Sequence, residues 1–474
     1  MNIFEKLKEK GYETIPAEFY TMVSLWKSWY DGDVASFHNY KVFNGQKQVR
    51  CKRHSLGMAK KVAEDWANLL LNEKVKITLE GEKEQAFFDD VCRANNFRTK
   101  ANEMQEMKSA YGTAAYIPRA VGVEVNAEDG VLLGNATAVK IDYVTADHIF
   151  PLSWENGIVT ECAFADVKST GDKKYLYLQI HTIGEDGNYV IENAFYEMNN
   201  EQLTEVSNKD VRGYERVPER VLTGSKKRQF VIDRLNIANN VDVSLPMGIP
   251  AFANAIDCLK GVDVAYDSYV NEFVLGKKRI IVKPEATKSL DGNPYFDEND
   301  LTFYVLPEDG GSGNVVEEID MNLRTEAHSK GIQDMLNALS SKCGFGENHY
   351  KYDRGSIATA TQIVSENSTL FRTLKKHEIL LEDVLVELCR IILRMGNTYM
   401  NAGLNEEVEV SIDFDDSIIE DKATEFSRDM QMMNAGVLND WEFRAKWMNE
   451  DVETAKISLP RMEDMTTEPQ REVE

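Results

Sequence analysis

The chain has 474 residues, 43% hydrophobic and 28% charged, which is the composition of a folded protein large enough for about two to four sub-domains. Its formal net charge of −25 argues against a protein that binds nucleic acid over its whole surface, but it allows local or brief contact. No run approaches the ~20 apolar residues of a membrane span, and we expect no signal peptide because the first residues lack an apolar core.

The cysteines are scattered singly along the chain, without a C-x-x-C pair. They are Cys51, Cys92, Cys162, Cys258, Cys343 and Cys389. This pattern argues against a disulfide framework and a zinc site, and it favours a reducing compartment. We expect each to be a small, mostly buried hydrophobic side chain.

The first forty residues are rich in aromatic side chains, as is usual for a segment that docks on a core or on a neighbouring subunit. An amphipathic helix is predicted over Leu56–Leu70 and an alternating strand over Val75–Leu79. Two shorter helices follow, one around Phe88 and one over Met104–Tyr111, which Gly112 closes as a C-cap.

Short alternating runs dominate the next part of the chain, from Thr113 to Arg228, and Gly, Asp and Asn turns separate them. The clearest are Ala138–Val144, Lys174–Ile180 and Tyr189–Ile191. They predict an antiparallel sheet preceded by helices. The fold class is therefore α+β, not a wound βαβ order.

Two helices that flank a small β insert are predicted in the middle of the chain. The first spans Pro250–Phe273, with Pro250 at its first position, and ends at Gly276. The insert contains strand-like Arg279–Val282 and Leu301–Leu306, and the second helix spans Thr325–Lys342.

A glycine-punctuated loop, Cys343–Gly355, leads into about 40 residues of helical pattern between Ser356 and Met395. At ~1.5 Å per residue this helix would be roughly 60 Å long, so we expect it to pack against something outside its own domain. His377 on this helix is expected to be interfacial or partly exposed.

After Gly396 comes a strand candidate, Val408–Phe414, and then an acidic region that begins at Asp415. This region predicts a helix over Ala423–Met433, a second helix that contains Trp441, and a frayed tail.

Catalytic motifs are missing from the sequence. It has no H-E-x-x-H, no G-x-S-x-G, no Walker loop and no G-x-G-x-x-G that opens a helix, and its seven histidines lack metal-ligand spacing. Gly310–Gly313 is interpreted as a flexible turn. Asp413, Asp415 and Asp416 are interpreted as acids at a strand end, with a metal-dependent nucleic-acid enzyme as the alternative. We expect no enzyme activity, catalytic residue, metal or cofactor.

The loop is unusual because it gathers aromatic and basic side chains in an acidic protein. Gly344, Gly346 and Gly355 permit backbone conformations that are closed to other residues. Such side chains can contact phosphates and sugars without reading sequence. The alternative is an ordinary connection between helices. The candidate DNA-facing residues are His349, Tyr350, Lys351, Tyr352 and Arg354.

The order of these elements resembles the portal proteins of tailed bacteriophages. The resemblance is carried by Pro250–Phe273, Gly276–Asp320, Thr325–Lys342, Gly344–Gly355 and the helix from Ser356. Supporting segments are Trp26–Tyr30 with Asp31 and Gly32, Lys61–Leu71, Ala110–Ile117 and Thr359–Asn367.

The resemblance implies a portal-like architecture with an α/β wing, a helical stem, a small β-rich clip, a long kinked helix and a helical C-terminal crown. The implied parts are a wing (1–245), a stem helix (246–275), a clip (276–322), a second stem helix (323–343), a tunnel loop (344–355), the long helix with a return to the wing (356–414), and a crown with an acidic tail (415–474).

The resemblance also implies a virion protein at the unique capsid vertex, assembled in the host cytoplasm as a ring of about twelve copies. The ring would be the channel for packaging and ejecting double-stranded DNA without sequence specificity. Implied partners are the terminase large subunit, the major capsid and scaffolding proteins, and head-completion or adaptor proteins, with no membrane. The clip would dock the motor through Lys277, Lys278, Arg279, Asp297 and Glu298. An alternative is a minor head or adaptor protein without a through-channel.

Overall fold

The computed structural model describes residues 3–43, 46–123, 136–199, 202–276, 279–282, 303–305, 316–319, 322–352, 360–414, 422–448 and 450–457. The chain divides into two compact units, Met1–Phe414 and Asp415–Glu474. Helices and antiparallel sheets alternate in blocks along the first unit, which agrees with the α+β class expected from the sequence.

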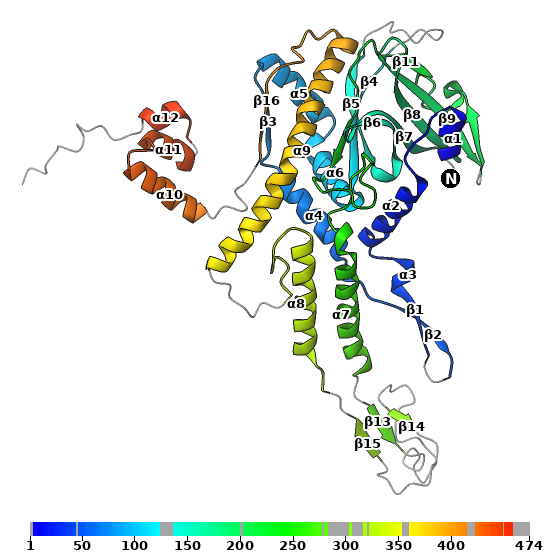
Figure 1. Ribbon diagram of the computed structural model, residues 1–474, viewed down its shortest axis with the longest axis vertical. Helices are drawn as coiled ribbons and strands as arrows, with labels where there is room; N and C mark the ends of the chain where they lie inside the picture. Colours follow the sequence, from blue (N-terminus) through cyan, green and yellow to red (C-terminus); the bar gives the residue numbers. More distant parts are fainter. Residues whose placement is uncertain are drawn as a thin grey trace, which may run out of the picture. The chain divides into compact units, whose positions relative to one another are not determined.

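The N-terminal segment contains α1 (Ile3–Glu9), α2 (Ala17–Tyr30) and α3 (Ala35–His38), followed by a hairpin of β1 (Asn39–Phe43) and β2 (Gln48–Lys52) (Figure 1). Tyr20 stacks on Phe150 with ring centroids 5.0 Å apart, and Phe4 meets the edge of the same ring. The aromatic residues of this segment therefore dock on the core of their own unit, which is one of the two outcomes expected.

A large antiparallel sheet has the strand order β10-β9-β8-β7-β6, and β11 pairs with β9. Its central strands pair from Tyr175↔Glu197 to Ile183↔Tyr189, and they bury Leu176, Leu178 and Ile180 on one face. The strands are β6 (Ile149–Glu155), β7 (Ile158–Thr170), β8 (Lys173–Ile183), β9 (Tyr189–Asn199), β10 (Gln202–Val206) and β11 (Arg220–Leu222), with 3₁₀ turns at η1 (Ala146–His148) and η2 (Asn208–Asp210). The predicted antiparallel region is confirmed.

A second sheet, with the order β12-β4-β5, forms a layer with the helices. Its strands are β4 (Thr113–Val121), β5 (Ala138–Thr145) and β12 (Val231–Arg234), and the helices are α4 (Met58–Leu70), α5 (Glu82–Ala94), α6 (Phe97–Tyr111) and α9 (Ala360–Met400). A small ladder beside them pairs β3 (Lys76–Leu79) with β16 (Val410–Asp413), so the two isolated strand candidates are partners.

Helix α9 differs from its prediction in two respects. It continues through Gly396 to Met400. A Cβ at Gly396 would come 2.7 Å from the Phe87 ring, so this glycine allows close packing and does not mark a helix end. From Leu370 to Tyr399 it buries a continuous series of side chains against β4, β12, α4 and α5 of its own unit. The expectation that it needs a partner outside its domain is therefore wrong for this stretch.

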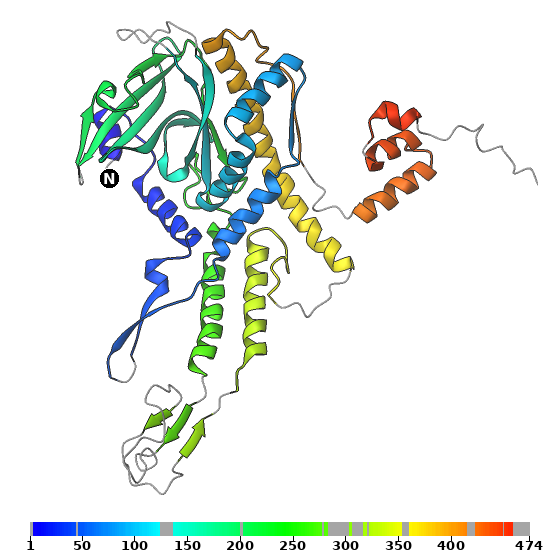
Figure 2. The same cartoon turned by 180° about the vertical axis from the view of Figure 1, so that it is seen from behind.

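Helices α7 (Ile256–Leu275) and α8 (Thr325–Lys342) lie side by side in both views (Figures 1 and 2). Pro250 does not begin α7. The Ala251 N–H donates to the Ser109 carbonyl, and a turn leads into the 3₁₀ helix η3 (Ala253–Ala255) before α7 starts. The insert between the helices has β13 (Arg279–Val282) paired parallel to β14 (Phe303–Val305) and antiparallel to β15 (Val316–Ile319), a strand the sequence did not predict.

The second unit contains α10 (Lys422–Asn434), α11 (Asp440–Met448) and α12 (Val452–Ile457). The rings of Phe426, Phe443 and Trp447 form a cluster, and Asp429 accepts hydrogen bonds from Lys446 and from the Trp447 indole. Helix α12 was not predicted from the sequence, and the expected frayed tail falls on residues after Ile457, outside the described part of the chain. The Asp415 and Asp416 carboxylates lie outside the described residues.

Candidate functional site

The helix pair α7–α8 buries one apolar stripe from each helix. Leu259 and Val262 of α7 are buried, as are Ile332, Leu336 and Leu339 of α8. At their closest approach, Gly261 faces the Met335 sulfur, which lies 3.0 Å from where a Cβ would be. The absence of a side chain at residue 261 therefore allows the two helices to approach closely.

An ion pair joins the ends of the two helices where the insert begins and ends. Glu272 accepts two hydrogen bonds from the Arg324 guanidinium, at 3.0 and 2.8 Å, and one from its backbone N–H at 3.1 Å. These bonds lower the pKa of Glu272 to about 2. Because this ion pair links the end of α7 to the start of α8, the two connections to the insert begin at fixed positions.

Two carboxylates on α7 anchor the N-terminal segment that carries the β1–β2 hairpin. Asp263 is buried and accepts hydrogen bonds from His38 Nε2 at 3.1 Å, the Ser55 hydroxyl at 3.0 Å and the Leu56 N–H at 2.8 Å. One turn later, Asp267 accepts from the N–H and ring Nδ1 of His54, both at 2.9 Å. The Val34 N–H donates to His38 Nδ1, so the proton of this neutral ring is on Nε2.

The loop after α8 is packed against α4 by a stack of three rings. Phe345 stacks on Trp66 with centroids 4.8 Å apart and on His349 at 4.4 Å. The Trp66 indole donates to the Cys343 carbonyl at 3.1 Å, and the His377 ring meets the edge of Trp66. His377 is only 3% exposed, and burial lowers its pKa to about 3, so the expectation of an interfacial or partly exposed residue is wrong.

Gln333 of α8 holds the far end of the loop with both ends of its amide. Its Nε2 donates to the Tyr350 carbonyl at 2.8 Å, and its Oε1 accepts from the Tyr352 N–H at 2.7 Å. Gly344 and Gly346 have φ values of +88° and +89°, which glycine adopts without strain. At Gly344 a Cβ would also lie 2.8 Å from Thr373 of α9.

The predicted DNA-facing residues have different environments within this loop. Tyr350 is buried and burial raises its pKa, while Tyr352 is half-buried and Lys351 is exposed. His349 is partly exposed, with Nε2 3.7 Å from Asp65. Although burial opposes it, His349 and Lys61 hold the pKa of Asp65 below its ordinary value. Arg354 lies outside the described residues. The DNA-facing role of all five remains a prediction.

The candidate motor-docking residues are mostly outside the described part of the chain. Lys277, Lys278, Asp297 and Glu298 are not described, and Arg279 begins β13, where it pairs with Ile319. Sequence reasoning did not identify Trp66, Phe345 and Gln333 as the residues that hold the loop. Trp66 was part of the predicted amphipathic helix, but no local pattern indicated a contact with a residue so distant in sequence.

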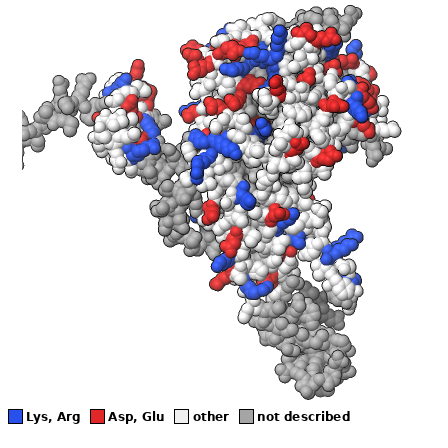
Figure 3. Space-filling view, in the orientation of Figure 1, with Lys and Arg blue, Asp and Glu red and all other residues white. Residues whose placement is uncertain are grey.

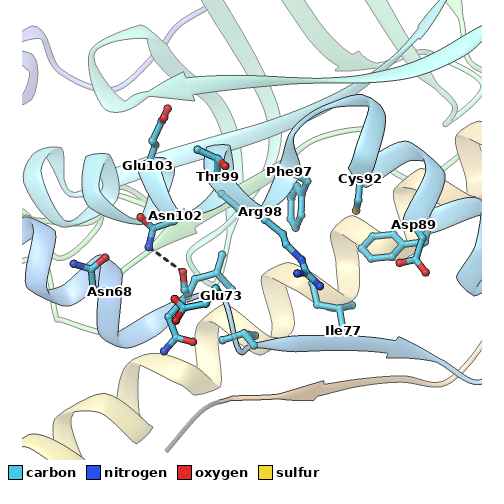
Figure 4. Close-up of a pocket in the computed structure, with 15 residues that line it drawn as sticks. Asn68, Glu73, Ile77, Asp89, Cys92, Phe97, Arg98, Thr99, Asn102 and Glu103 are labelled. Carbon is cyan, nitrogen blue, oxygen red and sulfur yellow. Dashed lines mark hydrogen bonds between the residues drawn. The ribbon is translucent and has the colours of Figure 1, made fainter. Parts of the chain in front are cut away.

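A cavity of about 390 Å³ lies between α4, α5 and α6, away from the helix pair (Figure 4). Arg98 and the carboxylates of Glu73, Asp89 and Glu103 line it. Asn102 closes one side by donating to the Leu71 carbonyl at 2.9 Å. Burial raises the pKa of the Cys92 thiol in its wall to about 12. The lining therefore lacks a reactive thiolate or a paired acid and base.

Charged side chains of both signs are mixed over the visible face, but the β1–β2 hairpin carries blue side chains only (Figure 3). Within the described residues no group of His, Cys, Asp and Glu side chains could hold a metal ion. The same residues contain no helix long and apolar enough to cross a membrane.

Comparison with known families gives a match over nearly the whole chain. The family described as "Phage portal protein, SPP1 Gp6-like" matches residues 10–468. No curated protein matches the chain. The matched range includes the helix pair, the insert, the loop, α9 and the second unit.

Proposed function

The chain belongs to the SPP1 Gp6-like family of phage portal proteins, and from this membership we propose how its parts build the channel. Membership makes it a structural phage protein of the capsid vertex, with the DNA-packaging channel and the head-to-tail connection as its role. A ring assembly that meets the capsid and the terminase follows for the family in general. Family membership disfavours the alternative of a metal-dependent nucleic-acid enzyme.

In our proposal α7 and α8 are the stem helices of the ring. The observation that carries this assignment is that the pair buries one face and leaves large apolar side chains exposed on the others. These are Val264, Phe273 and Val274 of α7, and Leu323 just before α8. Identical neighbours in a closed ring would cover such side chains, because each copy uses two different faces.

The loop after α8 is proposed as the tunnel loop. The ring stack of Trp66, Phe345 and His349 forms its base, and Gln333 fixes its return. In the proposal, Lys351, Tyr352 and Arg354 are the side chains that reach the channel. Phosphate contacts from such side chains are independent of sequence, as a moving duplex requires.

The remaining assignments follow the same scheme. Residues 1–245 and 356–414 would form the wing, 276–322 the clip and 415–474 the crown. The clip, through Lys277, Lys278, Arg279, Asp297 and Glu298, would dock the terminase large subunit and later the head-completion or adaptor proteins. The major capsid and scaffolding proteins would meet the ring in the host cytoplasm during assembly.

The ring itself is tested by the mass of the purified particle and by electron microscopy along its axis. About a dozen copies around an open centre are expected. A stable single chain, or a closed particle without a central channel, would instead favour a minor head or adaptor protein.

The loop assignment is tested by replacing Lys351 and Arg354 with Ala. Rings should form normally, while DNA packaging or retention in phage particles should fall. The matched control replaces two exposed lysines of the first unit, Lys8 and Lys209, with Ala, which removes the same charge outside the loop. Equal packaging by both double variants would contradict the loop assignment.

A further inference from the structure

The β1–β2 hairpin is a ribbon of two strands that pairs with no other strand within the described residues. A two-stranded ribbon alone is marginally stable in water, and both of its edges have unpaired backbone groups. Yet its base is fixed: Asp263 and Asp267 bind the residues on either side of it, and the Arg53 N–H donates to the His38 carbonyl. The hydrogen bonds at its base therefore fix the direction of the ribbon, although no other strand among the described residues pairs with it.

The two faces of the ribbon differ in chemistry. The register pairs Tyr40 with Cys51 and Val42 with Val49, so four apolar or aromatic side chains share one face. The other face carries Lys41 opposite Arg50, Lys52 at the base, and Phe43 opposite Gln48 at the outer end. Val42 is 46% exposed and Phe43 60% exposed, so the outer part of the ribbon leaves apolar surface in water.

The ribbon is also the basic exception in an acidic chain. From residue 34 to residue 63 the sequence contains no Asp or Glu, although the whole chain has 79. The seven basic residues in this stretch are Lys41, Lys47, Arg50, Lys52, Arg53, Lys60 and Lys61. A partner with exposed carboxylates and some apolar surface would complement both faces.

We propose that the β1–β2 ribbon docks on the exposed side of α8 in the next copy of this chain. This inference rests on the proposed ring. A ring contact joins one side of a subunit to the opposite side of its neighbour. The ribbon is anchored on α7, and α7 lies between it and α8 in both views (Figures 1 and 2), so the side of α8 is the one that a neighbour's ribbon meets.

The exposed side of α8 fits such a ribbon. It presents Glu326 and Asp334, about two turns apart, for Lys41 and Arg50, and Lys330 lies between them, one turn from each. Gly331 lies between the two acids in sequence, and apart from its chain neighbours and the adjoining backbone of α8, no described atom comes within 4 Å of where its Cβ would be. A glycine inside a helix is unfavourable. Close approach by the backbone of another chain would explain why residue 331 is a glycine.

A charge exchange tests the proposal on the full chain. The variant Lys41→Glu with Arg50→Glu should shift the particle mass from the ring toward the single chain. Adding Glu326→Lys and Asp334→Lys to that variant should restore the ring. All four side chains are exposed, and an unchanged thermal unfolding midpoint of the single chain shows that folding is intact.

The outcomes separate the inference from the function on which it rests. If the unaltered chain forms no rings, the proposed ring fails and the inference with it. If the unaltered chain and the Lys41→Glu, Arg50→Glu variant form equally stable rings, only the inference is overturned. This holds also if the variant ring retains less DNA, because the ribbon would then be a DNA contact. Loss of rings without rescue would overturn α8 as the docking face.

Discussion

Among the described residues of the first unit, Lys108 of α6 and Asp233 of β12 are the most deeply buried lysine and aspartate. Their side chains are 1% and 0% exposed, and Nζ lies 3.0 Å from Oδ1. Gln105 donates to the other carboxylate oxygen at 2.7 Å. Burial lowers the pKa of Lys108, although Asp233 opposes this. The pair therefore joins a helix to the sheet beneath it, but only while both charges are present.

Removing one charge of the Lys108–Asp233 pair should destabilise the first unit more than removing both charges. Lys108→Met leaves a buried carboxylate, and Asp233→Asn leaves a buried ammonium group, so each should cost about 3–5 kcal/mol. The double variant has no unpaired charge and should lose less than the sum of the two. Thermal unfolding of the four proteins measures this. Additive losses would show that the two groups do not act as a pair.

His181 of β8 makes the stability of the first unit sensitive to acid. It is 1% exposed, neither ring nitrogen has a hydrogen-bond partner within the described residues, and burial lowers its pKa from 6.5 to about 3. Between these pH values the unfolded chain binds more protons than the folded one. Stability is therefore full above pH 6.5 and falls toward pH 3, by up to about 1.4 kcal/mol per pH unit for each such histidine.

We expect His181→Phe to flatten this acid dependence. The flanking rings of Phe164 and Phe230 can pack against another ring, and Phe takes up no proton. The unfolding midpoint of the variant should fall less between pH 7 and pH 4.5 than that of the unaltered chain. His148→Gln, at a partly exposed histidine, is the control and should leave the slope unchanged. An unchanged slope for His181→Phe would contradict the prediction.

At the scale of elements, periodic patterns predicted which helices and strands exist, and tertiary contacts decided where they end. Gly112 was predicted as the cap of α6 and has the left-handed φ of +88°. Pro250 was predicted to start α7, but the Ala251 N–H is bound to Ser109 instead. The sequence places a boundary of α9 at Gly396, yet the helix continues to Met400, and the glycine there is explained by its close contact with Phe87. Such pairings between distant segments leave no local pattern in the sequence.

The crossing of Gly112 and Gly248 is one such pairing and can be tested. A Cβ on Gly112 would lie 2.8 Å from the Gly248 carbonyl carbon and 2.8 Å from Ile249 Cα, both backbone atoms that cannot move aside. Overpacking costs about 1–3 kcal/mol, and a left-handed backbone with a side chain adds about 1–2 kcal/mol. Gly112→Ala should therefore lower the unfolding midpoint sharply.

The matched control is Gly331→Ala in α8 of the single chain, where nothing lies within 4 Å. There the same substitution should raise helix stability by up to about 1 kcal/mol. The two variants thus make the same chemical change, with opposite expected effects on the free energy of unfolding. A neutral Gly112→Ala would mean that the backbones separate at little cost.

For the whole molecule, the order of elements predicted the family, while the candidate DNA and motor residues could not be placed by order alone. Tyr350 is buried because Gln333 and the Trp66–Phe345 stack draw the loop inward, and those partners are far from it in sequence. The asymmetry of the β1–β2 ribbon was present in the sequence as a stretch without acids, but only the strand register divides it into two faces.

The described residues of the second unit, Asp415–Glu474, form only a small core. Among its described residues only Asp429 and Ala455 are buried. Large apolar side chains remain in water across all three helices: Phe426, Met430, Met432, Val437, Met448, Val452 and Ile457. Short helices without a buried apolar face are marginal, so we expect this unit to be stabilised by a partner surface in the assembled ring.

We therefore expect the amides of 422–448 to exchange rapidly in the single chain and to be protected in the assembled ring, as measured by hydrogen exchange. A chain that ends at Phe414 should keep the unfolding midpoint of the first unit, since the two units form separate contact clusters. Met432→Ser with Met448→Ser should reduce the protection in the ring and leave that midpoint unchanged, because both side chains are exposed in the single chain. Strong protection of 422–448 in the single chain would instead mean that the aromatic cluster of Phe426, Phe443 and Trp447 is a sufficient core by itself.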